Sequence, residues 1–426
     1  MYELWIGQSQ SLIDRSHQPG FVDKLGIDLT AFPMTDQTRK CRAAGMKALA
    51  KPNWPKYYHL LEPSSAKFIS SLLCKSQDSN KPVNIFAHLR HIVFDLCLSL
   101  THGASFGEVD DDFMLTFFKS INSVSAVRSS TKPFRHFIPI PRIVPEPQTQ
   151  TVAGEKVRRK HRNVLYNSYQ ERVARGETVD CIVSSLTDDG LTEEEIHGTC
   201  ISLLQAGPDT VASGVYQTVA GLSSPAGHAT QDRALGSYPR SLRRRPHKSL
   251  GERVPRRARS FDYVSLYRGA TLFHSRTVRY ASSLDERSHY AQRCRRAKGT
   301  TFILNAQQVD HDEDHFGSDA WSFKPEPFID AKPGLEHVAF GAGSRICPAV
   351  AISDRIIRAL VTRLILAFEM DSSREGGRQP NIVAIHFSLV VDQLVAHSSR
   401  YDCYFNARDP VWLAEVVAKE QEAALA

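Results

Sequence analysis

The stretch FGAGSRICPAVAI, residues 340–352, is a glycine-rich turn that runs into an apolar, helix-like segment, with Cys347 at the junction. A thiolate is stabilised by backbone N–H groups and by the positive end of a helix, and a turn that leads into a helix offers both. Gly341 and Gly343 permit backbone conformations that other residues avoid and allow close approach to a flat ligand. The stretch therefore indicates a reactive cysteine. The alternative is a small apolar residue that is buried where a helix begins.

Two other side chains of this stretch suit a large, flat, anionic ligand. Arg345 lies two residues before the cysteine and can pair with a carboxylate. Phe340 can pack beneath a large apolar body. Together with Cys347 they fit an iron macrocycle, with the thiolate on the metal, the arginine on a propionate and the phenylalanine under the ring.

The flanking sequence predicts a mainly α fold with a small β portion, in a single domain over residues 1–426. After the cysteine, apolar residues recur every fourth position from Ile352 to Phe368, which is typical of a buried helix face. Before it, residues 298–308 alternate like a strand. Helical spacing marks three earlier stretches, 84–100, 110–127 and about 152–175.

A longer helix is predicted from Thr192 onward. Thr192 and Glu195 have the spacing of a capping box, and the helical run that follows is about 30 residues, long enough to cross a domain. Its middle reads Ala-Gly-Pro-Asp-Thr, residues 206–210. Glycine and proline inside a helix cost about 1 and about 3 kcal/mol, so they need a reason. Either the helix kinks or breaks there, or small residues open a groove in which Asp209 and Thr210 handle protons.

The string F-G-x-G-x-R-x-C resembles the haem-binding loop of the cytochrome P450 family, although Ala349 stands where that family usually has glycine. Residues 206–210 are similar to the oxygen-side motif of the same family, and residues 321–328 are similar to the meander before its haem loop. The resemblance covers roughly residues 1–227 and 298–400. It is greatest to fungal members that hydroxylate phenylacetate and related aromatic acids.

The resemblance implies a haem-thiolate monooxygenase whose cofactor is haem b. It implies O2, a small aromatic substrate and NADPH–cytochrome P450 reductase as partners, and a role in secondary-metabolite biosynthesis or aromatic acid catabolism. The residue roles that it implies are iron ligation by Cys347, cofactor binding by Phe340, Gly343 and Arg345, and catalytic proton delivery by Asp209 and Thr210.

Two family features are missing. Neither glutamate of residues 228–297, Glu252 or Glu286, has an arginine three residues later, and Pro327 stands where the meander usually has arginine. In the family these groups form a buried ion network that holds the cysteine loop, and breaking a buried pair typically costs about 3–5 kcal/mol. The alternative hypothesis is therefore a catalytically defective relic with impaired haem binding.

Positive charge is concentrated in one segment. The net charge is +7, and residues 231–300 hold 18 Lys and Arg against 5 Asp and Glu. A basic surface can bind nucleic acid, but this one falls where a family helix is expected and carries no pattern of a known binding module. We interpret residues 228–297 as an aberrant Arg-rich segment that is prone to disorder, and we expect no nucleic-acid partner.

Eight scattered cysteines without a C-x-x-C pair favour a reducing, intracellular location. No apolar run approaches the roughly 20 residues that span a bilayer, so no transmembrane anchor is expected in this chain. Family members sit at the endoplasmic reticulum membrane, and the sequence of this chain aligns from a point after their first helices. We therefore expect a fold that is incomplete at its N-terminus, with membrane association in a full-length form.

The acidic run 311–315 is interpreted as solvated charge and not as a metal site.

Overall fold

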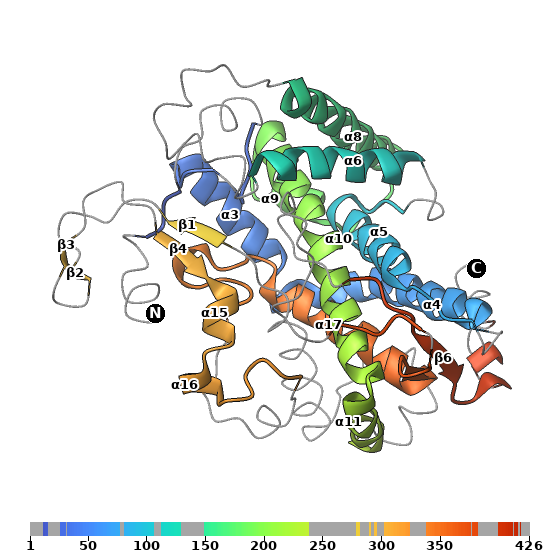
Figure 1. The fold of residues 1–426 in the computed structure, drawn as a ribbon. Helices are drawn as coiled ribbons and strands as arrows, with labels where there is room; N and C mark the ends of the chain where they lie inside the picture. The colour runs from blue at the N-terminus through green and yellow to red at the C-terminus, as the bar shows by residue number, and fades with distance from the viewer. Residues whose placement is uncertain are drawn as a thin grey trace.

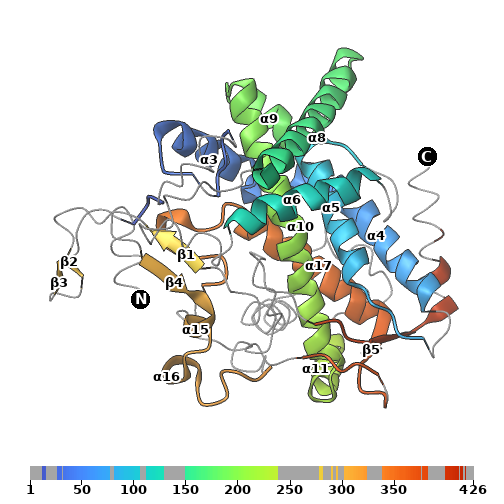
Figure 2. The same cartoon turned by 45° about the horizontal axis from the view of Figure 1, so that its top comes forward.

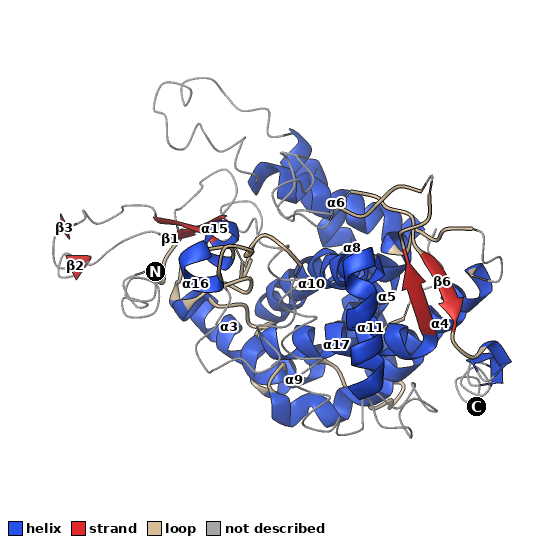
Figure 3. Cartoon of the chain, turned by 60° about the horizontal axis from the view of Figure 1, so that its bottom comes forward, coloured by secondary structure: helices blue, strands red, loops and turns tan. Residues whose placement is uncertain are grey.

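The described part of the chain is mainly helical, with three two-stranded sheets (Figure 1, Figure 3). The computed structural model describes residues 12–15, 26–30, 32–76, 81–105, 112–128, 149–237, 278–281, 289–290, 294–295, 302–323, 338–375, 377–381, 399–411, 413–415 and 418. The helices are α3 (Asp36–Ala48), η1 (Lys51–Tyr57), α4 (Tyr58–Lys75), α5 (Phe86–His102), α6 (Asp112–Arg128), α8 (Thr149–Ala174), α9 (Ile182–Asp188), α10 (Glu193–Ser223), α11 (Pro225–Ser237), α15 (Ala306–Asp310), α16 (Glu313–Phe316), η6 (Gly343–Arg345) and α17 (Val350–Ala367). The strands are β1 (Val278–Ala281), β2 (His289–Tyr290), β3 (Cys294–Arg295), β4 (Phe302–Asn305), β5 (Phe368–Asp371) and β6 (Tyr404–Ala407).

Helix α10 runs through the middle of the molecule and packs on both α5 and α17 (Figure 1, Figure 2). The predicted capping box is confirmed: the Glu195 N–H donates to Thr192 Oγ1, and the Thr192 N–H donates to the Glu195 carboxylate at 2.9 Å. The helix continues through Pro208 to Ser223 as one element of 31 residues. The alternative of two shorter helices is therefore wrong.

Glycines set how closely α10 approaches its neighbours. A Cβ added at Gly207 would lie 2.5 Å from Sγ of Cys97 on α5, and one added at Gly214 would lie 3.1 Å from Cδ1 of Ile357 on α17. The glycine of the 206–210 motif thus has a packing reason, because it lets α5 come close to α10.

A second layer covers α5 and α10. Helices α6 and α8 lie side by side there (Figure 1, Figure 2), and an aromatic cluster joins them to α5. Phe94 of α5 stacks in tilted fashion on Phe117 and Phe118 of α6, with ring centroids 5.1 and 5.2 Å apart. His161 of α8 meets the Phe117 ring edge-on at 5.4 Å. The same apolar cluster includes Ile201 and Leu204, so it holds the two helices against the first half of α10.

The small β portion differs in part from the sequence prediction. In the described part of residues 298–308, Phe302–Asn305 form a strand, β4, which pairs antiparallel with β1, and the next residues, Ala306–Asp310, form α15. Phe368, the last member of the predicted helical stripe, is not in α17: it begins β5, which pairs with β6. An apolar residue every fourth position cannot distinguish the end of a helix from a following strand whose alternate residues are buried.

Several expectations concern residues outside the described ranges. These are the missing Glu-x-x-Arg pattern around Glu252 and Glu286 and the meander position of Pro327. Of the Arg-rich segment 228–297, the structure describes the part in α11 and strands β1, β2 and β3.

Candidate functional site

The cysteine loop is a closed turn that precedes α17. The Cys347 N–H donates to the Phe340 carbonyl at 2.9 Å, and the Ile346 N–H donates to the Gly343 carbonyl at 3.0 Å. Gly341 and Gly343 have φ of 78° and 65°, a left-handed conformation that favours glycine. Helix α17 begins only at Val350, so the turn itself sets the position of Cys347. The Cys347 side chain is half-buried.

Arg42 of α3 lies beside this cysteine. Its guanidinium donates to the Ile346 carbonyl, and the residue is buried. Burial lowers the pKa of Arg42, while the negative charge of a Cys347 thiolate raises it. The same attraction favours the thiolate form of the cysteine. Sequence reasoning missed Arg42, because 304 residues separate it from Ile346 and no local pattern marks it.

Arg345 is buried and ties the loop to the N-terminal part of the chain. Its Nε donates to the Ile13 carbonyl at 2.6 Å, and its Nη2 donates to the Phe32 carbonyl at 2.7 Å. The predicted pairing of Arg345 with a propionate stays a prediction. Phe340, half-buried, packs against the main apolar core.

A buried carboxylate holds the other end of the loop. Asp310, fully buried at the end of α15, accepts a hydrogen bond from the Val338 N–H at 2.8 Å. Val338 also packs in a small apolar cluster with Leu12 and Leu304, and its carbonyl accepts from the Gly341 N–H at 2.7 Å. The loop is thus anchored through described residues that the sequence comparison did not single out.

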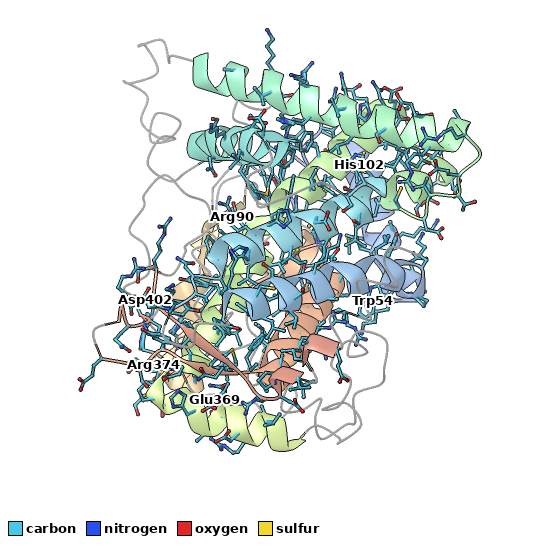
Figure 4. The ribbon with its side chains drawn as sticks, turned by 90° about the vertical axis from the view of Figure 1, so that its right-hand side faces the viewer. Trp54, Arg90, His102, Glu369, Arg374 and Asp402 are labelled. Atoms are coloured by element: carbon cyan, nitrogen blue, oxygen red, sulfur yellow. The ribbon has the colours of Figure 1, made fainter. Side chains whose placement is uncertain are left out.

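The two predicted proton-handling residues lie in the unbroken middle of α10. Thr210 is exposed, and its Oγ1 donates to the Ala206 carbonyl at 2.6 Å. Asp209 points to the neighbouring helix α5, where its Oδ1 lies 2.7 Å from Nε of Arg90. The Arg90 guanidinium also lies 4.0 Å from the centroid of the Phe118 ring. Figure 4 labels Arg90 near one end of α5.

The remaining described cysteines differ from Cys347 in their surroundings. None of the seven cysteines described with side chains forms a disulfide. Burial raises the pKa of Cys97 and Cys403 to about 12 and that of Cys181 to about 11, so these thiols stay protonated. Cys74 is exposed on α4. Cys347 is set apart because it combines partial exposure with a guanidinium at its side.

The donor set around Cys347 fits a haem held by one thiolate. Among the described residues there is no group of three or more His, Cys, Asp or Glu side chains that could hold a metal ion. Of the run 311–315, the three acids Asp312, Glu313 and Asp314 are exposed, as solvated charge would be, whereas His311 is buried. A half-buried sulfur in a glycine turn, beside a cation, would suit a haem iron that takes one ligand from the protein, and it would not suit a centre of several protein ligands.

This fold, with one cysteine presented by a glycine turn before α17, defines a cytochrome P450. The profile of the family described as Cytochrome P450 matches residues 13–223 and 297–392, and the chain belongs to that family. The match stops and resumes at the borders of the Arg-rich segment. The family implies a haem bound through a cysteine thiolate, a redox partner, O2 and an organic substrate. When bound, the haem supplies the activation of oxygen.

Two of the relatives that cover most of the chain are fungal enzymes. Phenylacetate 2-hydroxylase of Emericella nidulans is 26% identical over 442 residues, which cover 99% of this chain and 82% of the relative. 3-Hydroxyphenylacetate 6-hydroxylase of the same organism is 22% identical, covering 92% and 75%. A zebra fish cytochrome P450 solved with abiraterone superposes with a TM-score of 0.69 at 16% identity, over 96% of this chain and 91% of that one. At that identity the similarity is one of fold.

None of the helices that the structure describes combines the length and the hydropathy of a membrane-spanning segment.

Proposed function

We propose that this chain hydroxylates a small aromatic acid of the phenylacetate type. The observation that carries the proposal is the intact cysteine loop, in which the half-buried Cys347 lies beside the buried Arg42. The choice of substrate is supported by the phenylacetate hydroxylase relative, which aligns over 99% of the chain. NADPH–cytochrome P450 reductase is the proposed source of electrons.

Each site residue has a proposed role. Cys347 ligates the haem iron, and the residues Phe340, Gly343 and Arg345 hold the cofactor around it. Thr210 presents an exposed hydroxyl that already donates to the Ala206 carbonyl, so it can relay a proton by rotating away from that acceptor. Asp209 is the proposed proton source behind Thr210, and Arg90 positions it.

A carbon monoxide difference spectrum of the reduced protein tests the cofactor role. We expect the red-shifted Soret band of a thiolate-ligated haem in the unmodified protein and its loss in Cys347→Ala. Cys74→Ala is the matched control, because it removes an exposed thiol on α4 and should leave the spectrum unchanged. A spectrum that survives Cys347→Ala would overturn the assignment.

Product analysis tests the substrate class. With reductase, NADPH and phenylacetate, we expect a product one oxygen atom heavier than the substrate, and less of it from Thr210→Ala than from the unmodified protein. If the haem spectrum is present and no aromatic acid is oxidised, the substrate proposal fails and the family assignment stands.

One observation favours a second candidate, a relic that has lost turnover. No glutamate of residues 228–297 has an arginine three residues later, so this segment lacks the sequence pattern of the family's usual ion network. A folded chain that takes up no haem when supplied with haemin would support this candidate against the enzyme.

A further inference from the structure

A pocket separate from the cysteine loop lies between α8, the first turns of α10 and residues 26–27. Its volume is about 380 Å³, within the range of about 300–1,000 Å³ that is typical of small-ligand sites. Ile27, Gly198 and Ile201 supply its apolar lining. A Cβ at Gly198 would lie only 2.5 Å from Cβ of Ile27, so glycine allows this segment to close on α10.

A second feature of this pocket is an unsatisfied polar atom on its lining residue His197. The residue lines the pocket and is 6% exposed, and its Nε2 has no hydrogen-bond partner among the described residues. The nearest carboxylate oxygen, on Glu193, is 3.9 Å away, beyond hydrogen-bond distance. Tyr166 packs edge-on against the imidazole at 4.4 Å and restricts its rotation. Burial lowers the pKa of His197 to about 4, so the ring is neutral near pH 7 and one of its nitrogens carries a proton.

Three arginines of α8 also line the pocket, and they differ in whether a carboxylate lies within ion-pair distance. Glu155 pairs with Arg158 at 2.7 Å and with Arg159 at 2.9 Å. No carboxylate of the described residues lies within ion-pair distance of Arg162, whose Nε donates only to the Asn163 side chain at 3.4 Å. Burial and the charges of Arg159 and Arg158 lower the pKa of Arg162, while the negative charges of Glu155 and Glu194 raise it. The acids of this pocket, Glu193 and Glu194, are exposed at its rim.

We propose that this pocket binds a small aromatic carboxylate, with its carboxylate on Arg162 and on an Nε2–H of His197 and its ring on the apolar lining. Guanidinium and imidazole N–H groups are both donors to carboxylate oxygen. The inference rests on the proposed function for the choice of acid, and it places a second, peripheral binding site on the same enzyme. Gly198 and Gly207 are nine residues apart on α10, about 14 Å along the helix, so the pocket lies one to two nanometres from the oxygen-side motif.

Nuclear magnetic resonance of the histidine side chains tests this site directly. Protein labelled at histidine Cε1 is titrated with phenylacetate, and the His197 signal is identified by its disappearance in His197→Phe, which retains a ring against Tyr166. We expect a saturable shift of the His197 signal with phenylacetate and little shift with the neutral phenylacetamide. Arg162→Gln should raise the Kd by about five- to tenfold. Lys160→Gln removes the same charge from an exposed position of α8 outside the pocket and should leave the Kd within about twofold.

Three results would overturn the proposal. These are equal affinity for phenylacetamide, an unchanged Kd in Arg162→Gln, or tighter binding of phenylalanine, whose ammonium would prefer Glu193 and Glu194 at the rim. The outcome is separable from that of the proposed function. A chain that binds phenylacetate at His197 but forms no oxidised product keeps this site and loses the function. A chain that oxidises phenylacetate while the His197 signal does not shift keeps the proposed function and loses this site.

Discussion

At the scale of single residues, the state of Cys347 depends on one neighbouring charge. The thiol lies in a turn where the Cys347 N–H is bonded to the Phe340 carbonyl, and the structure places the guanidinium of Arg42 beside it. A thiolate is the form that ligates metal and reacts with electrophiles. Arg42 therefore belongs to the site although it touches no predicted catalytic residue.

Removing the charge of Arg42 should make Cys347 less reactive. In haem-free protein at neutral pH, we expect Arg42→Gln to slow alkylation of Cys347 by iodoacetamide about two- to fivefold, because the thiolate loses its counter-charge. Mass spectrometry of the cysteine peptides measures the rate at each site. Cys74 is the internal reference, since it is exposed on another helix, and Arg42→Lys should retain most of the wild-type rate. Equal rates in wild-type and Arg42→Gln would remove Arg42 from the site.

At the scale of elements, the contact of α10 with α5 depends on Gly207 and Cys97. We expect Gly207→Ala to lower the free energy of unfolding by about 1–3 kcal/mol, because the new Cβ would overlap Sγ of Cys97. Cys97→Ala removes that sulfur, so the double variant should be more stable than the sum of the two single effects predicts. Urea denaturation measures all four proteins. Gly236→Ala on α11, where nothing lies within 4 Å of an added Cβ, is the control and should be neutral or stabilising.

A second contact between elements joins α5, α6 and α10 through Arg90. Its side chain is 27% exposed and that of Asp209 is 15% exposed, so water weakens the ion pair. A double-mutant cycle of Arg90→Gln and Asp209→Asn should give a coupling of about 1 kcal/mol in urea denaturation. Strictly additive effects would mean that Arg90 does not hold Asp209, and they would contradict the positioning role that we propose for Arg90.

At the scale of the whole molecule, local patterns predicted the elements and long-range contacts completed the site. The capping box at Thr192 and the glycine turn before Cys347 are written in a few consecutive residues, and both are confirmed. Arg42 and Arg90 were missed because each meets a partner from a distant element, and an arginine in a helix usually indicates only a solvated face. The sequence pattern placed Phe368 in the helix that became α17, because Phe368 is buried like the apolar residues of that helix. In the structure it is the first residue of β5.

The stability of the molecule toward acid should depend on two buried histidines, His102 at one end of α5 (Figure 4) and His197 near the start of α10. Burial lowers their pKa values from 6.5 to about 3 and about 4, and the charge of His197 also lowers the pKa of His102. In this pH range the two histidines bind protons in the unfolded chain but stay neutral in the folded chain. The free energy of unfolding therefore has its full value above pH 6.5 and decreases as the pH falls from 6.5 toward 4.

We expect the free energy of unfolding to decrease by about 1–2 kcal/mol per histidine at pH 5, as measured by urea denaturation at pH 7, 6 and 5. His197→Phe should flatten this dependence and His315→Gln, at an exposed position, should not; equal slopes in all three proteins would contradict the assignment.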